Sequence, residues 1–217
     1  MTQNSNKKIY IERLFPNVAE NNLYHKLKID YESIMYITIP QHADSITNII
    51  IGYLNKYGMK SSDIIITDAT AGVGGDTISF AKKFKEVIAI EIDKTRYNYL
   101  SNNICVYKLE NVILFCDDLL KVVPLIDQHD IIFIDPPWGG KEYKKIDLLK
   151  LHIGSEELET CCNNFFDKTK TKCIPKFIIL KLPSNYDIEF LKSKLQENAI
   201  IDIHNLHKMI IVVLIKK

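Results

Sequence analysis

The sequence lacks the features that would place it in a membrane or in the secretory pathway. None of its apolar runs approaches the 18 residues that can cross a bilayer. The N-terminal stretch, MTQNSNKK, is not followed by the apolar segment of a secretory signal. Its five cysteines are an odd number without a CxxC pair, which argues against a disulfide framework and a structural zinc site. These absences predict an intracellular protein, in the nucleus or the cytoplasm, that holds no metal ion.

The chain also has little net charge and almost no arginine. The formal charge is +1, and 26 of its 28 basic residues are lysines. The molecule as a whole therefore does not attract polyanions, and any contact with nucleic acid must come from a local patch. With 217 residues, 47% of them hydrophobic, the chain is long enough for one full-sized domain with a buried core.

Short apolar runs rich in isoleucine and valine alternate with helix-length segments. Such runs are typical of strands buried on both faces of a parallel sheet, and their alternation with helices indicates βαβ units. The last two runs are separated by only a few residues, which predicts an antiparallel hairpin. The expected strands are 64–67, 87–90, 112–115, 131–134, 177–182, 200–204 and 209–215, and the expected helices are 77–84, 94–108 and 119–126.

The first 60 residues come before the first of these strands. A helix is expected over residues 40–57, with Pro40 near its start. We therefore expect an N-terminal extension with a packing helix over residues 1–60, and an α/β domain over residues 61–217.

A glycine-rich turn, DATAGVGGDT, follows the first strand. Gly72 and Gly74 allow a tight turn and a close approach of the backbone to a ligand. Asp68, which precedes them, would repel a pyrophosphate but attract a cationic amino group. The GxxxxGK[ST] pattern is absent, which argues against nucleoside triphosphate binding by that route.

Acidic residues also follow the second and third strands. Glu91 lies 19 residues after Gly72, where a carboxylate can accept both hydroxyls of a ribose. Asp117 or Asp118 could accept a hydrogen bond from an adenine amine. An amino acid, a ribose and an adenine without phosphate together describe S-adenosylmethionine. The alternative is that Glu91 and Asp118 only cap helices.

The fourth strand runs into a rigid corner, IIFIDPPWGG. A carboxylate followed by two prolines and an aromatic residue is the pattern of methyl transfer to an exocyclic or amide NH2 group. Hydrogen bonds from that group to Asp135 and to the carbonyl of Pro136 can localise its conjugated lone pair. Trp138, the only tryptophan of the chain, can stack on a planar base.

In this order, the segments DATAGVGGDTISFA, VIAIEID, LFCDDLL and IDPPWGGKEY closely resemble the trimethylguanosine synthase family of RNA cap guanine-N2 methyltransferases. The resemblance extends from about residue 27 to the C-terminus. It implies a Rossmann-like class I methyltransferase with a mostly parallel seven-stranded sheet, a C-terminal antiparallel hairpin and a short N-terminal helical extension. It further implies methyl transfer from S-adenosylmethionine to N2 of a 7-methylguanosine cap, with capped RNA as the partner. The charged surface makes a monomer the expected state. The chain resembles the catalytic core of the family alone, as expected of a viral or protist protein, and a viral protein would act in the host cell.

The resemblance also assigns roles to individual residues. Asp135 and Pro136 would be catalytic, and Trp138 would stack on the 7-methylguanine, whose charge strengthens the contact with an indole. Asn103 matches a position near the guanine edge. The cofactor-binding positions would be Thr38, Asp68, Ala71, Gly72, Gly74, Thr77, Glu91 and Asp118.

Three places depart from the family pattern. Around Thr38, the family's Thr-Pro-Glu is replaced by TIPQ. Asp135 stands where the family often has serine, and Ser184 stands where it tends to have an arginine for the cap phosphates. Lys181 could supply a point charge to the phosphates instead, without bidentate geometry.

Two other functions fit the same motifs. The first is methylation of guanine N2 or adenine N6 in ribosomal or other RNA. The second is a non-catalytic subunit of methyltransferase fold that binds RNA or a protein partner. The intact Asp135, Trp138 and glycine turn argue against that second function.

Overall fold

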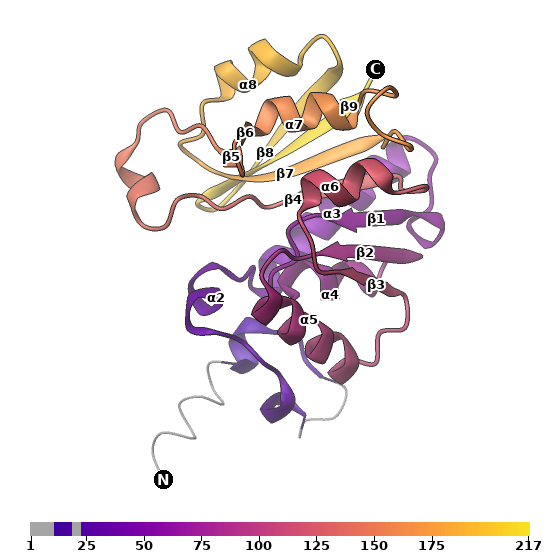
Figure 1. Cartoon of the computed structure of the whole chain (residues 1–217), viewed down its shortest axis with the longest axis vertical. Helices are drawn as coiled ribbons and strands as arrows, with labels where there is room; N and C mark the ends of the chain where they lie inside the picture. The colour runs from indigo at the N-terminus through magenta and orange to yellow at the C-terminus, as the bar shows by residue number, and fades with distance from the viewer. Residues whose placement is uncertain (1–10, 19–22) are drawn as a thin grey trace. The chain divides into compact units, whose positions relative to one another are not determined.

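The computed structural model describes residues 11–18 and 23–217 (Figure 1). The chain divides into two compact units, Met1–Asp118 (unit 1) and Leu119–Lys217 (unit 2). The domain boundary expected near residue 60 stays a prediction. In the part of the chain that the structure describes, no helix is both long and apolar enough to cross a membrane.

Unit 1 contains three parallel strands in the order β3-β2-β1. Thr67 of β1 pairs with Ile88 of β2, and Ile88 pairs with Ile113 of β3, so the carboxyl ends of the three strands meet at one edge. Two helices make the crossovers that parallel pairing requires. The elements are β1 (Ile65–Asp68), α4 (Gly75–Ala81), β2 (Glu86–Ile90), α5 (Lys94–Val106) and β3 (Val112–Phe115).

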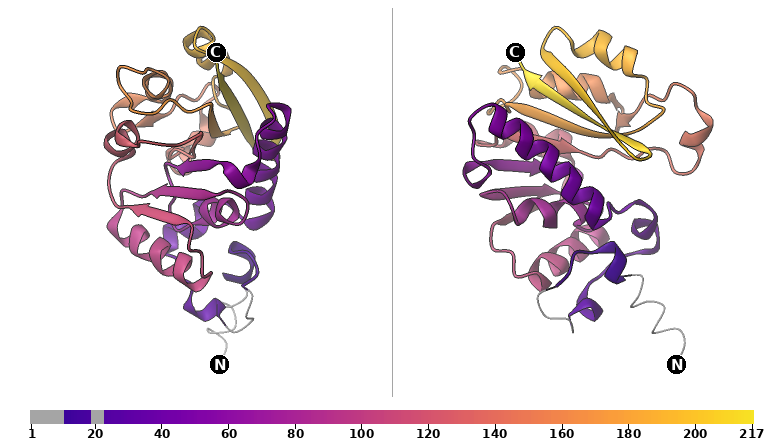
Figure 2. Two further views of the ribbon diagram at one scale, coloured as in Figure 1. Left: turned by 90° about the vertical axis from the view of Figure 1, so that its right-hand side faces the viewer. Right: turned by 180° about the vertical axis from the view of Figure 1, so that it is seen from behind.

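The segment before β1 packs on this core. Its elements are η1 (Tyr24–Lys26), α2 (Tyr31–Tyr36), α3 (Pro40–Lys56) and η2 (Ser61–Asp63). α3 begins at Pro40, whose missing N–H costs nothing at a first helical position, and it packs against α4 (Figure 2). Phe15 and Leu27 share a buried cluster with Leu100 and Ile104 of α5. Residues 11–18 and 23–64 are therefore part of the folded unit.

Unit 2 contains four strands in the order β4-β7-β9-β8. β4 and β7 pair in parallel, whereas β9 pairs antiparallel with both β7 and β8. The elements are α6 (Leu119–Val122), η3 (Val123–Leu125), β4 (Ile131–Ile134), η4 (Glu142–Lys145), β5 (His152–Ile153), β6 (Glu156–Glu157), α7 (Leu158–Phe165), β7 (Phe177–Pro183), α8 (Ile188–Leu195), β8 (Ala199–Leu206) and β9 (Met209–Lys216).

The predicted α/β class, the mostly parallel seven-stranded sheet and the C-terminal antiparallel hairpin are confirmed. The helix expected over residues 119–126 is shorter: α6 ends at Val122 and a 3-10 turn follows, because Pro124 cannot donate the next helical hydrogen bond. In the hairpin, β8 ends at Leu206 and β9 begins at Met209, so the connection between them is shorter than expected.

Candidate active site

Asp68 ends β1 and is locked onto the first turn of α4. Its Oδ2 accepts a hydrogen bond from the Thr77 hydroxyl at 2.5 Å, and both residues are buried. Its Oδ1 lies 3.4 Å from the backbone N–H of Thr70. Two predicted cofactor residues are thus in direct contact, and the carboxylate has one defined position beside the glycine turn.

The glycine turn needs glycine for two different reasons. Gly72 and Gly74 have φ angles of +55° and +105°, which side-chain-bearing residues rarely adopt. A Cβ on Gly75 would lie 2.9 Å from the carbonyl oxygen of Thr38. A Cβ on Gly72 would meet no atom within 4 Å, so the backbone there faces open space that a ligand can enter.

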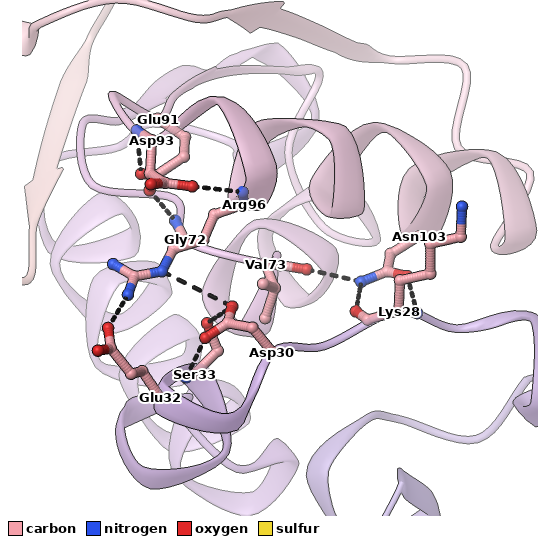
Figure 3. Close-up of polar contacts among 10 residues, drawn as sticks. All are labelled: Lys28, Asp30, Glu32, Ser33, Gly72, Val73, Glu91, Asp93, Arg96 and Asn103. Carbon is pink, nitrogen blue, oxygen red and sulfur yellow. Dashed lines mark hydrogen bonds and ion pairs between the residues drawn. The ribbon is translucent and has the colours of Figure 1, made fainter.

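Glu91 follows β2 and is bonded to the same turn. Its Oε2 accepts from the N–H of Gly72 at 2.8 Å, and its Oε1 accepts from the N–H of Asp93 at 2.7 Å (Figure 3). Burial raises the pKa of Glu91, although both backbone hydrogen bonds lower it. Each carboxylate oxygen keeps a second lone pair for a hydroxyl group.

The remaining predicted cofactor residues lie around this turn or at the end of β3. Ala71 is held by a hydrogen bond from its N–H to the carbonyl of Ile90. Asp118 follows β3 and is half-buried, next to the exposed Asp117. Since β2 and β3 are parallel neighbours, Asp118 and Glu91 lie at the same edge of the unit 1 sheet.

Thr38 reaches the turn through a residue that the sequence reasoning did not assign. The Thr38 hydroxyl donates to Oδ2 of Asp76 at 2.5 Å, and both side chains are buried. The sequence signal that could have indicated Asp76 is its position as an acidic residue in the first turn of the helix after the glycines. Asp76 adds a third buried carboxylate, after Asp68 and Glu91, to the surroundings of the turn.

Asn103 of α5 is surrounded by backbone groups of unit 1. It is fully buried, and its Oδ1 accepts from the N–H of Lys28 at 2.8 Å. Its Nδ2 donates at 2.9 Å both to the carbonyl of Lys28 and to that of Val73 (Figure 3). The amide therefore joins the N-terminal segment to the glycine turn, and its expected contact with the guanine edge stays a prediction.

The same N-terminal segment is fastened by Arg96 of α5. Its guanidinium lies 2.6 Å from Oε2 of Glu32 and 3.7 Å from Oδ2 of Asp30 (Figure 3). Asp30 caps α2 by accepting from the N–H of Ser33 at 2.9 Å. Partial burial raises the pKa of Asp30, but the bonds from Ser33 and the charge of Arg96 bring it below its ordinary value.

In unit 2, the predicted corner begins at Asp135, directly after β4. Ile134 pairs with Leu180 of β7, and the next residue on β7 is Lys181. The Lys181 ammonium lies 2.5 Å from Oδ2 of Asp135, and the two side chains are 5% and 20% exposed. Burial raises the pKa of Asp135, while the charge and hydrogen bond of Lys181 and the indole of Trp138 oppose that rise.

Trp138 lies in the same group of side chains. The Lys181 ammonium is 5.7 Å from the centre of its ring, and Tyr143 meets the ring edge-on at 5.3 Å. Its buried indole Nε1 faces Asp135 but has no partner at hydrogen-bonding geometry. Gly139 has a φ of +86°, which lets the chain turn directly after the tryptophan. The structure thus brings Asp135, Trp138 and Lys181 together.

The surroundings of the glycine turn fit S-adenosylmethionine. Three buried carboxylates would reject a phosphate group, but they suit a ligand that carries an ammonium, a sulfonium and ribose hydroxyls. The open backbone at Gly72 leaves room for such a ligand. Among residues 11–18 and 23–217, no three histidine, cysteine or acidic side chains are grouped as metal ligands.

Comparison with known proteins agrees with this geometry. The fold is that of Rossmann-like methyltransferases. The model of the RNA cap guanine-N2 methyltransferase family matches residues 63–216, and the chain belongs to that family of S-adenosylmethionine-dependent enzymes. An uncharacterized protein of Acanthamoeba polyphaga mimivirus is 40% identical over 225 residues, which cover 95% of this chain and 86% of that protein. The trimethylguanosine synthase of Schizosaccharomyces pombe is 27% identical, covering 75% of this chain and 65% of that protein.

Solved structures show the same fold at low sequence identity. A putative methyltransferase from Escherichia coli has a TM-score of 0.58 at 15% identity, covering 80% of this chain and 86% of that one. A 16S rRNA N2 methyltransferase from T. thermophilus, in complex with AdoMet and guanosine, has a TM-score of 0.59 at 16% identity. That match covers 88% of this chain and 44% of the other.

Proposed function

We propose that this protein transfers a methyl group from S-adenosylmethionine to the exocyclic N2 of the 7-methylguanosine cap of RNA, yielding one or two methyl groups on that nitrogen. The observation that carries the proposal is the grouping of Asp135, Trp138 and Lys181 after β4 and on β7, in a chain of the cap guanine-N2 family. The name of the S. pombe relative supports the same substrate.

The residues of unit 1 would hold the cofactor. Asp68 and the backbone at Gly72 and Gly74 would face its methionine part, and Glu91 would accept the ribose hydroxyls. Asp118 would accept from the adenine amine. Thr38, Ala71 and Thr77 would shape the turn through the bonds described above. When bound, the cofactor supplies a methyl group on a sulfonium, which is a good leaving group, so no metal ion is required.

The corner in unit 2 would hold the base. The Asp135 carboxylate and the Pro136 carbonyl would accept the two N2 hydrogens, which turns the nitrogen lone pair away from the ring. Transfer would form the N2–methyl bond as the sulfonium–methyl bond breaks and the thioether leaves. The positively charged N2 would then release one proton, which Asp135 would accept. Alignment of the reacting groups provides most of the rate enhancement in this scheme.

Trp138 would make the site selective for the methylated cap. A 7-methylguanine carries a positive charge, and an indole attracts a cation by about 0.5–2 kcal/mol beyond ordinary stacking. An unmethylated guanine is uncharged and therefore lacks this attraction to the indole. The expected preference for the 7-methylated cap is therefore roughly 2- to 30-fold in affinity.

Methyl transfer from labelled S-adenosylmethionine tests this function directly. We expect transfer to a 7-methylguanosine cap dinucleotide, little transfer to the unmethylated dinucleotide, and none to uncapped RNA. Asp135→Ala is the matched control, and it should abolish transfer while cofactor affinity, measured by calorimetry, is kept. Equal transfer to uncapped RNA would favour a ribosomal or other RNA base as the substrate. Failure to bind the cofactor at all would favour a non-catalytic role.

A further inference from the structure

The pair of Asp135 and Lys181 is unusual for its position. Lys181 lies in β7, all of whose residues are buried, and only 5% of its side chain is exposed. A buried ammonium without a partner would cost several kcal/mol, so a buried lysine in the middle of a strand needs a partner or a function. Its partner is the carboxylate that the proposed reaction uses.

The contacts of Lys181 argue against the phosphate-binding role expected from the sequence. A lysine that binds phosphates usually extends into solvent as a mobile point charge. Here the ammonium points inward, 2.5 Å from Asp135 and 5.7 Å from the centre of the Trp138 ring. It joins the side chain that would accept the substrate amine to the side chain that would stack on the base.

We propose that Lys181 is the positioning residue of the reaction: its ammonium holds the Asp135 carboxylate in the ionised form and fixes that carboxylate relative to the Trp138 ring. This inference rests on the proposed function, because it assigns to Asp135 the acceptance of the N2 hydrogens. An ionised carboxylate has about four lone-pair sites, so the bond to Lys181 leaves acceptor capacity for the substrate.

The chemistry follows from the charge state. Only the ionised carboxylate can accept both the N2 hydrogen bond and, after the N–C bond has formed, the released proton. A protonated Asp135 keeps one acceptor oxygen for the NH2 group, but it accepts more weakly than the carboxylate and cannot take up the released proton. Burial favours that protonated form, and Lys181 opposes it. In unit 2, the groups facing Asp135 include Lys181 from β7 and the Trp138 indole from the loop, with Tyr143 from η4 against the edge of the indole.

The first test uses the single tryptophan as a reporter. Because Trp138 is the only tryptophan, intrinsic fluorescence reports on this group of side chains without labelling. We expect a pH-dependent change in the emission of the wild-type protein, with its midpoint at higher pH in Lys181→Met and no change in Asp135→Asn. An equal midpoint in the wild type and Lys181→Met would overturn the proposal. This readout needs no substrate, so it stands even if the cap is not methylated.

The second test is a kinetic cycle with Lys181→Met, Asp135→Asn and the double variant, whose neutral pair leaves no buried charge unpaired. We expect Lys181→Met to lower kcat at neutral pH by about tenfold or more. The kcat of this variant should recover partly at higher pH, and its cofactor affinity should be unchanged. In the Asp135→Asn background, Lys181→Met should cost almost nothing further. If Lys181→Met lowered kcat equally in the wild type and in Asp135→Asn, the proposal would be overturned. A raised KM for the cap at unchanged kcat would also overturn it, because that result would indicate a phosphate contact.

Discussion

Replacing Asn103 with alanine should destabilise the protein strongly. The bond to the carbonyl of Val73 is buried, and leaving that acceptor without a partner costs about 1–3 kcal/mol. The two bonds to the backbone of Lys28 are partly buried, so each contributes about 0.5–1.5 kcal/mol. Together these contributions predict that the free energy of unfolding falls by about 2–6 kcal/mol.

Chemical denaturation measures this change, and the chain offers a matched control one residue away. Asn102 also donates to a backbone carbonyl, that of Lys26 at 2.8 Å, but in an exposed setting where water can replace the side chain. Asn102→Ala should therefore cost less than about 1 kcal/mol. If Asn103→Ala costs no more than the control, the three backbone hydrogen bonds of Asn103 do not stabilise the fold. If it instead raised KM for the cap with stability unchanged, Asn103 would belong at the guanine edge after all.

Two further predictions concern other residues. Trp138→Ala should weaken cap binding by about 1–3 kcal/mol in a fluorescence-independent assay such as calorimetry, and unchanged affinity would show that the ring does not stack on the base. His129 is buried, and burial lowers its pKa below 6.5 despite the opposing effects of Cys173 and Asp130. His129 therefore binds a proton more readily in the unfolded chain than in the folded one. Its contribution to stability should be complete above about pH 6.5 and should be lost as the pH falls below that value. His129→Gln should flatten this dependence in denaturation curves, and an unaltered slope would assign the effect to another group.

Much of the fold follows from the sequence because apolar runs and their spacing are local signals. The strands at residues 112–115 and 131–134 were predicted to the residue. The acids after β1, β2 and β3 could be placed together because parallel strands bring their carboxyl ends to one edge. α2 was missed because six residues are too few for a helical period to be visible.

The contacts that the sequence could not predict join residues far apart in the chain. The pair of Asp135 and Lys181 spans 46 residues and depends on the register between β4 and β7. The role of Asn103 depends on the path of a segment 75 residues earlier, which no local pattern encodes. A polar residue on a helix can be read as a ligand contact or as a buried link, and only its surroundings distinguish the two.

The most direct test of the proposed function is mass spectrometry of a 7-methylguanosine cap dinucleotide incubated with the protein and S-adenosylmethionine, followed by fragmentation to locate the new methyl groups. We expect one or two added methyl groups, all on N2 of the 7-methylated guanine, and none with Asp135→Ala. A cap that stays unmodified while the protein binds the cofactor and methylates uncapped RNA would contradict the proposed substrate.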